Sequence, residues 1–380
     1  MKVFFLDQSG QPGGAELCLL DIAKIYQETC LVGLFADGSF PDLLKQHQIP
    51  CQIFNKQAIS VRKESGLLES LNSISQLLPL ITQVSKISRN YDLIYANTQK
   101  ALVVGAIASL LSRRPLVYHL HDILSLEHFS SSNRRLAVSL ANRFASVIIA
   151  NSQASRNAFI AAGGKAELTQ VVYNGFATAE YLEREFNRQE IRQSLGINQE
   201  FVVGHFSRLS PWKGQHILID SLVHCPENVT VILVGDALFG EQDYVEKLHQ
   251  KVAELGLQKR VKFLGFRSDV PQLMSACDLV AHTSTAPEPF GRVIVEAMLC
   301  NTPIVAAAAG AAIELVEHGT TGWLTPPGNS LKLADVINTC QQQQELATKI
   351  AKKAQEKAQK RFDLKVINQQ IGKILQGVVA

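Results

Sequence analysis

The feature that most constrains this chain is a regular alternation of short apolar runs, rich in β-branched residues, with longer amphipathic stretches. In the first half of the chain the apolar runs occupy residues 3–6, 31–35, 93–95, 116–119, 147–150 and 170–172. A second series occupies residues 201–206, 229–235, 261–264, 279–282 and 304–307. Buried runs separated by helical segments are typical of parallel strands joined by crossover helices. We therefore predict an α/β chain with two Rossmann-like, doubly wound parallel sheets.

The two series predict two domains, and 380 residues are enough for both at about 150 residues per domain. A strong turn signal, Asn174-Gly175, and a polar stretch over 177–198 separate the two series. We therefore place the first domain at residues 1–175. Ligands of doubly wound sheets bind beyond the carboxyl ends of the strands. Two such domains facing each other across a cleft would hold their ligands in that cleft.

Composition excludes several classes of protein. The longest apolar runs, 101–111 and 303–313, have about eleven residues, whereas a membrane-spanning helix needs roughly 20. Asp7 interrupts the first apolar run too early for a secretory signal. The seven cysteines form no CxxC pair and are odd in number, which favours free thiols in a reducing compartment. A formal charge of +3 is too balanced for a dedicated nucleic-acid binder, so we expect a cytoplasmic chain that binds no nucleic acid.

Two loops after predicted strands suit anions. The first contains Gly13 and Gly14, and adjacent glycines at a helix start let backbone N–H groups approach an anion, although a simple turn explains them as well. It has neither the Gly-Lys-Ser/Thr ending of a P-loop nor a GxGxxG pattern. The second loop carries Arg208 and Lys213 beyond the run at 201–206. A guanidinium and an ammonium there suit a diphosphate, and two solvated cations are the alternative.

The most informative segment runs from Glu288 to Glu296, after the apolar run at 279–282. Prolines at 287 and 289 disfavour helix around Glu288 and hold it extended. A helix that begins near Gly291 would direct its first N–H groups at anionic oxygens. Glu296, roughly a turn into that helix, can accept hydrogen bonds from hydroxyls or simply interact with the helix dipole.

Histidines follow another predicted strand, at positions 119 and 121 before Asp122. His121 lies beyond the strand end, where it would face the cleft from the first domain; a purely structural role is the alternative. Two alternate histidines followed by an aspartate could indicate a metal site. No third group of ligands stands at a convincing spacing, so we predict no metal.

Together these segments resemble the retaining, nucleotide-sugar-dependent glycosyltransferases of family 4, also called glycosyl transferases group 1, which have the GT-B fold. The resemblance covers nearly the whole chain. Its most specific part is a pair of glutamates separated by seven residues, Glu288 and Glu296, with the sequence Thr302-Pro303-Ile304-Val305 after it. The chain departs from the family pattern at two places, because the family often has Gly at Asn301 and a Gly-Gly pair at Gly310-Ala311.

The resemblance implies that the protein is an enzyme, a hexosyltransferase that uses a nucleoside diphosphate sugar and needs neither cofactor nor metal. The catalytic residues that it implies are His121, Arg208, Lys213 and Glu288. The donor-binding residues that it implies are Gly13, Gly14, Arg208, Lys213, Gly235, Phe266, Glu288, Phe290, Gly291, Arg292, Val293 and Glu296. It also implies a donor-binding domain at 176–358 and a C-terminal helix at 359–380 that returns to the first domain.

The first domain should then recognise the acceptor, a glycan, a lipid-linked sugar or another glycoconjugate in polysaccharide biosynthesis. Residues 51–150 contain eleven Lys and Arg against five Asp and Glu, a balance of +6. With the apolar residues between 67 and 78, this balance is compatible with peripheral contact with an anionic membrane at its inner face, and equally with a solvated face over a core helix. Two other functions stay open: a UDP-sugar 2-epimerase of the same fold, and a catalytically degenerate partner subunit that binds sugar.

Overall fold

The computed structural model describes residues 1–54, 67–126, 129–182, 187–238 and 240–380. The chain divides into two compact units. Unit 1 consists of Met1–Gly175 together with Leu364–Ala380, and unit 2 consists of Phe176–Asp363. Unit 2 extends beyond residue 358 because Phe362 packs edge-on against Phe290 at 5.9 Å between ring centroids, and Asp363 accepts a hydrogen bond from Thr178.

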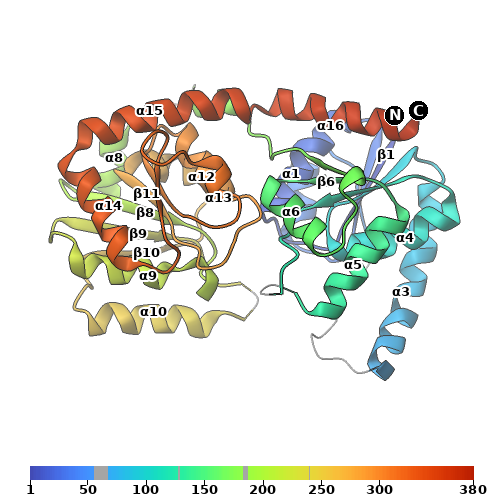
Figure 1. Cartoon of the computed structure of the whole chain (residues 1–380), viewed down its shortest axis with the longest axis horizontal. Coiled ribbons are helices and arrows are strands. Elements are labelled where there is room, and N and C mark those ends of the chain that lie inside the picture. Colours follow the sequence, from blue (N-terminus) through green and yellow to red (C-terminus); the bar gives the residue numbers. More distant parts are fainter. Residues whose placement is uncertain (55–66, 127–128, 183–186, 239) are drawn as a thin grey trace. The chain divides into compact units, whose positions relative to one another are not determined.

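Unit 1 is built on a seven-stranded parallel sheet with the order β3-β2-β1-β4-β5-β6-β7. Figure 1 labels β1 and β6 among its strands. Its strands are β1 (Val3–Asp7), β2 (Cys30–Leu34), β3 (Cys51–Ile53), β4 (Leu93–Ala96), β5 (Leu116–Leu120), β6 (Ala145–Ala150) and β7 (Thr169–Val171). Its α-helices are α1 (Gly14–Ala23), α2 (Ser39–Gln46), α3 (Leu67–Ser88), α4 (Gln99–Ser112), α5 (Ser131–Phe144), α6 (Gln153–Ala161) and α16 (Leu364–Val379). The sequence predicts six of these strands; the edge strand β3 is too short for a recognisable pattern.

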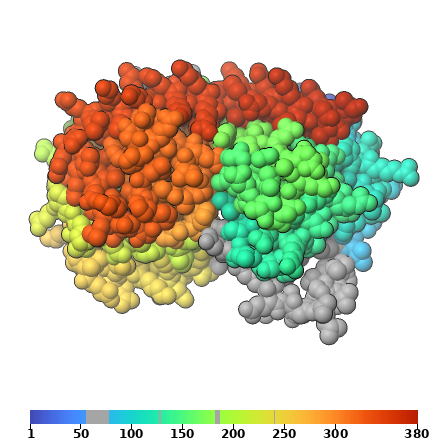
Figure 2. Space-filling view, in the orientation of Figure 1, coloured from blue at the N-terminus to red at the C-terminus, as the bar shows by residue number. Residues whose placement is uncertain are grey.

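Both faces of the sheet of unit 1 are buried, which is why its strands are apolar throughout rather than alternating. Phe4 and Leu6 point into one core, together with residues of α4 and α5. Val3 and Phe5 point into the other, together with residues of α1, α2 and α16. The apolar side of α16, which includes Ile367, therefore covers the same face as α1, and its other side lies on the molecular surface (Figure 2).

Unit 2 repeats this plan with a six-stranded parallel sheet in the order β10-β9-β8-β11-β12-β13. Its strands are β8 (Phe201–Phe206), β9 (Val229–Val234), β10 (Val261–Gly265), β11 (Leu279–His282), β12 (Ile304–Ala307) and β13 (Trp323–Thr325). Its α-helices are α7 (Thr178–Leu182), α8 (Arg188–Ser194), α9 (Gln215–Ser221), α10 (Gln242–Glu254), α11 (Val270–Ala276), α12 (Arg292–Leu299), α13 (Ala312–Leu315), α14 (Ser330–Gln342) and α15 (Gln344–Arg361). The three-residue edge strand β13 is again the one that the sequence did not predict.

Each sheet has one point where the order of its strands reverses. In unit 1, β1 lies between β2 and β4; in unit 2, β8 lies between β9 and β11. The loops on either side of such a point leave in opposite directions and expose the carboxyl ends of the two central strands, where ligands of doubly wound sheets bind. The loops after β1, β4 and β5 in unit 1, and after β8 and β11 in unit 2, are therefore the places to look for a site.

Among the residues that the structure describes, no helix is both long enough and apolar enough to cross a membrane. The expectation of a basic surface on the first domain depends in part on Lys56, Arg62 and Lys63, which lie outside the described residues. The side chains of residues 67–77 are likewise not described. Peripheral contact with a membrane therefore stays a prediction.

Candidate functional site

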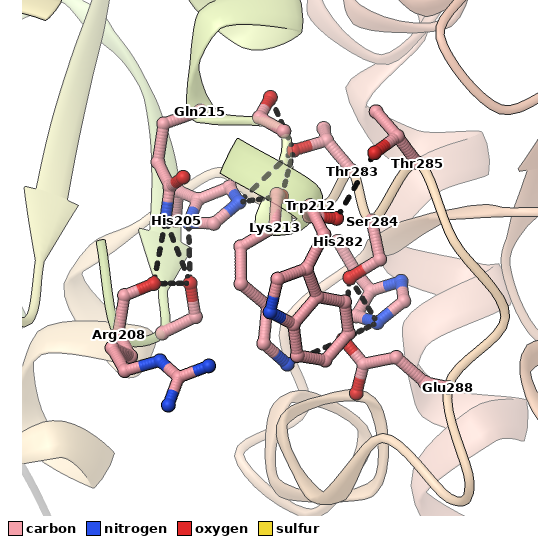
Figure 3. Close-up of polar contacts among 12 residues, drawn as sticks. His205, Arg208, Trp212, Lys213, Gln215, His282, Thr283, Ser284, Thr285 and Glu288 are labelled. Atoms are coloured by element: carbon pink, nitrogen blue, oxygen red, sulfur yellow. Dashed lines mark hydrogen bonds and ion pairs between the residues drawn. The ribbon is translucent and has the colours of Figure 1, made fainter. Parts of the chain in front are cut away.

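Lys213 and Glu288, which the sequence analysis took from two separate loops, are in direct contact in unit 2. Lys213 ends a short 3₁₀ turn (Pro211–Lys213) after β8, and Glu288 lies in the loop after β11. The Nζ of Lys213 donates a hydrogen bond to Oε1 of Glu288 at 2.6 Å and lies 4.1 Å from the ring centroid of Trp212 (Figure 3). Because β8 and β11 are neighbours in the sheet, their following loops meet at one edge although they are far apart in sequence.

Glu288 is a buried carboxylate surrounded by donors. Its residue is 6% exposed, and its Oε1 also accepts hydrogen bonds from Ser284 Oγ and from His282 Nε2, the latter at 2.9 Å (Figure 3). Burial by itself would raise the pKa of Glu288, but the charge of Lys213, and then that of His282, hold it well below its usual value. His282 ends the apolar run at 279–282 and Ser284 follows two residues later, and no sequence pattern predicted a role for either.

The backbone of Glu288 is held by the loop after β12. Ala311 N donates to Glu288 O at 2.9 Å, and Gly310 pairs with Glu288 in a parallel bridge. Gly310 has φ +58°, and a Cβ there would lie 2.3 Å from Glu288 O, so only glycine fits. Ala311 has a helical φ of −71° and needs no glycine, and Asn301 adopts φ +55° itself. The fold thus accommodates both departures from the family pattern.

The carbonyl groups of the loop after β8 are held by a buried threonine. Thr283 Oγ1 donates toward Lys213 O at 3.0 Å and toward Gly214 O at 2.8 Å. Gly214 has φ +72°, and a Cβ there would lie 2.0 Å from Thr283 O. His205 Nε2 lies 3.0 Å from Thr283 Oγ1, and burial, followed by the charge of His282, lowers the pKa of His205 to about 3, so this ring is neutral. These contacts fix the position from which Lys213 reaches Glu288.

Arg208, the second predicted cation of this loop, is oriented by its own partners. Its Nε lies 3.3 Å from Oε2 of Glu241, which in turn accepts a hydrogen bond at Oε1 from Ser210 Oγ at 2.5 Å. The fully buried Gln215 donates from Nε2 to the carbonyl oxygen of Arg208 at 2.9 Å (Figure 3). Arg208 and Lys213 therefore belong to one loop that is held by hydrogen bonds, although each has a different carboxylate partner.

Helix α12 begins where the sequence analysis expected, with Gly291 as its N-cap at φ +85° and no side-chain cap hydrogen bond. Glu296 lies one turn in, with its Oε1 3.5 Å from Nε of Arg292. The guanidinium of Arg292 lies over the ring of Phe176 at 4.6 Å. Phe290 is 3% exposed and stacks on that same ring, so its side chain packs in the core and only its backbone can contact a ligand. Val293 is half-buried.

The remaining predicted residues of unit 2 lie after β9 and β10, on the other side of β8. Gly235 has φ +134°, and a Cβ there would lie 2.0 Å from Ser207 O, so the loops after β8 and β9 pack backbone to backbone. Gly235 N donates to Gly265 O at 2.8 Å, and the next residue, Phe266, has a side chain that is 79% exposed. An exposed aromatic ring at a sheet edge is a suitable surface for a flat ring to stack on.

The predicted residues of unit 1 lie around a buried pair of acids. Gly13 N donates to Oε2 of Glu16 at 2.9 Å, and Glu16 interacts with Asp7 at the end of β1. Burial raises the pKa of Asp7 to about 6, and burial together with the charge of Asp7 raises that of Glu16 to about 8. Near neutral pH the pair therefore retains one proton. In the glycine loop that was expected to bind an anion, the backbone N–H of Gly13 thus already donates to the carboxyl group of Glu16.

His121 lies beyond the end of β5, as expected, and its Nε2 is 2.9 Å from Oδ1 of Asn97. No third metal ligand for the two histidines stands at a convincing spacing in the sequence, but the fold brings Cys18 close to them. One ligand atom each from Cys18, His119 and His121 lie within 4.8 Å of one another. Burial, and then the neighbouring His121, hold the pKa of His119 well below its usual value, and its Nδ1 lies 2.7 Å from the Tyr95 hydroxyl. The absence of a metal requirement stays a prediction.

Two hollows in unit 2 lie elsewhere. Arg188 and Asp278 contribute to both hollows. Asp278 immediately precedes β11 and accepts a hydrogen bond from Val202 N, near the start of β8. Both hollows therefore lie at the amino ends of the central strands, whereas Lys213 and Glu288 lie beyond the carboxyl ends.

Comparison with known proteins matches both halves of the chain. Residues 12–180 match the family described as Glycosyltransferase Family 4, and residues 187–357 match Glycosyl transferases group 1. Crystal structures of HepE from Anabaena, one in complex with UDP-glucose and one with UDP and glucose, are 63% identical to this chain and superpose with a TM-score of 0.92. Each comparison covers 99% of this chain, and 100% and 99% of HepE respectively.

More distant relatives match in part. Spore coat protein SA of Bacillus subtilis is 31% identical over 209 residues, which are 51% of this chain and 55% of that protein. D-inositol 3-phosphate glycosyltransferase of Mycobacterium marinum is 29% identical over 250 residues, which are 62% of this chain and 52% of that protein. The chain thus spans about half the length of these curated relatives.

Proposed function

The chain belongs to the GT-B glycosyltransferases of the group 1 and family 4 type, and from this premise we propose that it transfers a hexose from a nucleoside diphosphate sugar to a hydroxyl acceptor, with retention at the anomeric carbon. The observation that supports this most is the convergence of Lys213, Glu288 and the N-terminus of α12 at the carboxyl ends of β8 and β11. A diphosphate needs cations and N–H groups, and a sugar needs hydrogen-bond acceptors. This edge of unit 2 offers both.

The proposed donor is a UDP-hexose such as UDP-glucose. HepE, at 63% identity over nearly the whole chain, has been crystallised with UDP-glucose and with UDP and glucose. The exposed ring of Phe266 would take part in binding the base, next to Gly235. Glu296 would accept hydrogen bonds from the ribose hydroxyls.

The main chemical task is to stabilise negative charge on the departing diphosphate. The ammonium of Lys213 has three N–H donors and uses one on Glu288, so it can donate to a phosphate oxygen without leaving its partner. Arg208 adds a guanidinium from the same loop, and the first turn of α12 adds backbone N–H groups. With these groups in place, the transfer would require no divalent metal and no cofactor.

Glu288 is proposed to bind rather than to attack. In retaining glycosidases one carboxylate forms a covalent bond to the sugar. Here three donors already occupy Oε1 of Glu288, which suits a carboxylate that holds sugar hydroxyls in place. Retention would then follow from attack of the acceptor on the same face that the diphosphate leaves. His121 would contact the transferred sugar.

The proposed acceptor is a glycan, a lipid-linked sugar or another glycoconjugate that unit 1 recognises. The basic balance of residues 51–150 supports an anionic partner, and we include in the proposal a cytoplasmic enzyme with peripheral contact to an anionic membrane.

The test is an assay of nucleoside diphosphate release from a panel of nucleotide sugars, with and without sugar and lipid-linked acceptors. Release that depends on an acceptor, and a product of retained configuration by NMR, would support the proposal. Conversion of the donor to its 2-epimer without net transfer would show the epimerase instead. Binding of donor without turnover would show a partner subunit. A chelator should leave the rate of transfer unchanged.

A further inference from the structure

The two oxygens of the Glu288 carboxylate have different surroundings within unit 2. Oε1 accepts hydrogen bonds from Lys213 at 2.6 Å and from Ser284, and it lies 2.9 Å from Nε2 of His282. In the described part of the chain no group donates to Oε2, and this oxygen is not enclosed by protein atoms. Figure 3 shows Oε2 pointing away from the contacts of Oε1. The carboxylate therefore has one oxygen held by the protein and one that a ligand can reach.

The contact with Oε1 requires a hydrogen on Nε2 of His282. The carboxyl group of Glu288 is ionised at neutral pH because, against the effect of burial, the charge of Lys213 holds its pKa well below its usual value. An ionised oxygen can only accept, so the nitrogen 2.9 Å away must be the donor. Ser284 cannot supply this hydrogen, because its own hydroxyl hydrogen is already donated to Oε1. Nε2 therefore donates whether the ring is neutral or charged.

The position of the His282 ring favours a role in the site over a role in the core. His282 ends β11 with its side chain 5% exposed, and its Nδ1 is buried without a hydrogen-bond partner among the described residues. A histidine that only stabilised the core would satisfy both nitrogens, since an unpaired buried polar atom costs free energy. A Cβ at Gly291 would lie 3.7 Å from Nε2 of His282, so Nε2 lies beside the N-cap of α12. The polar contact of this ring is thus made next to the helix N-terminus that we propose for the diphosphate.

We propose that His282 is a positioning residue, which donates from Nε2 to Oε1 of Glu288 and thereby leaves Oε2 as the acceptor for one hydroxyl group of the bound sugar. This inference deepens the proposed function and rests on the proposed contact between Glu288 and the sugar. Without the imidazole, only Lys213 and Ser284 would hold Oε1, and the carboxylate could turn about its terminal bond, which has a broad torsional preference. Because a carboxylate oxygen only accepts, the hydroxyl group at Oε2 has to donate its hydrogen.

The test compares nucleotide sugars that differ in a single hydroxyl group. UDP-deoxyfluoroglucoses, with fluorine in place of each free hydroxyl in turn, keep a weak acceptor at that position but have no hydrogen to donate. In calorimetric titrations we expect fluorine at one position to weaken binding relative to UDP-glucose by about ten- to hundredfold, since a hydrogen bond to a charged group is lost. A series in which no position shows such a loss would overturn the proposal.

Two variants with side chains of similar length separate the hydrogen bond from packing. His282→Gln places an amide N–H near the position of Nε2, whereas His282→Met fills similar space without a donor. We expect the loss caused by fluorine at that position to shrink by about tenfold in His282→Met and to return in His282→Gln. The affinity for UDP, which has no sugar, should be nearly unchanged in both. The same loss in wild type and in His282→Met, or in the two variants, would contradict the assignment.

His216 gives a matched control in the same unit. It is a half-buried histidine of α9, and its Nδ1 lies 2.8 Å from the hydroxyl group of Tyr244. His216→Met removes a histidine contact that does not involve Glu288, so the loss caused by fluorine should stay as in the wild type. If it shrank here as well, the effect would belong to general packing and the proposal would fail.

The contact itself can be measured without any ligand. In the full chain labelled with ¹⁵N, long-range ¹H–¹⁵N correlation of the histidine rings distinguishes a protonated Nε2 from an unprotonated one, and the His282→Gln variant identifies the signals of His282. We expect a proton on Nε2 above about pH 8, where an ordinary imidazole is neutral. An unprotonated Nε2 would refute the donation to Glu288. Should the chain bind no nucleotide sugar, the proposed function would fail, while this spectrum would still decide the contact.

Discussion

The contact between Lys213 and Glu288 makes a strong prediction about unfolding. Lys213→Met keeps much of the apolar stem but removes the charge, and it leaves Glu288 as a buried carboxylate whose remaining donors are His282 and Ser284. Side-chain exposures of 17% and 8% place this pair among the buried ones. Removing one partner of a buried ion pair costs about 3–5 kcal/mol. We expect Lys213→Met to lower the free energy of unfolding of unit 2 by that amount at pH 7.

The size of this loss should depend on pH with a definite sign. The pKa of Glu288 is held below its usual value in the folded state, so its contribution to stability is present above pH of about 4.5 and is lost as the pH falls further. In Lys213→Met the positive charge that offsets the burial of Glu288 is gone, so the pKa of Glu288 rises and the carboxylate takes up a proton more readily. The deficit of the variant should be largest near pH 7 and should shrink toward pH 5. Glu288→Gln in the same background should recover most of the lost stability.

The assay is urea unfolding followed by tryptophan fluorescence, because both tryptophans, Trp212 and Trp323, lie in unit 2. The matched control is Lys251→Met. Lys251 also lies 2.6 Å from its partner, Asp220, but the two side chains are 34% and 31% exposed. A pair this much more accessible to water contributes about 0.2–1 kcal/mol. The explanation would be refuted if both variants lost the same free energy of unfolding. It would also be refuted if the loss in Lys213→Met did not change with pH, because a buried Glu288 without its cation must make the loss depend on pH.

Three further predictions follow from other contacts. Glu16→Gln should make the free energy of unfolding less dependent on pH. The pKa of Glu16 is raised to about 8, so its contribution to the free energy of unfolding is complete below its ordinary pKa and falls by about 1.4 kcal/mol per pH unit as the pH rises toward 8. A glutamine at this position cannot titrate. Phe266→Ala should weaken binding of a uridine nucleotide by about 1–3 kcal/mol, measured by calorimetry, with Leu238→Ala, another exposed apolar residue, as the control that should not. Gly310→Ala should reduce donor affinity by displacing the backbone of Glu288, whereas Ala311→Gly, one residue on, should leave it nearly unchanged; equal titration curves for the two would contradict this reading of the loop.

Much of the fold was predictable because it depends on local patterns. Buried parallel strands are apolar throughout, and eleven of the thirteen strands in the described part of the chain could be placed from that pattern alone. Strands β3 and β13 were not predicted, because a run of three residues is too short to show a recognisable hydrophobic pattern. The start of α12 at Gly291 followed from the prolines before it and the glycine itself.

Family resemblance supplied the residues of the candidate site, but not their partners. The sequence put Lys213 and Glu288 on a list of residues for a nucleotide sugar; only the adjacency of β8 and β11 made them an ion pair with His282 and Ser284 around it. Nothing in the sequence joined Asn97 to His121, or Asp7 to Glu16. These contacts link residues on different strands, and strand order is set by how whole helices cover a sheet, not by any short stretch of sequence.

The sequence by itself thus determined the elements, the two sheets and the family, because period, turn residues and motif spacing are properties of neighbouring residues. The tertiary structure decided which side chains form a buried ion pair, which carboxyl groups have a raised pKa, and which phenylalanine packs in the core and which lies exposed. Those outcomes depend on burial and on distances between strands, where a few tenths of an ångström and the exclusion of water decide charge and orientation.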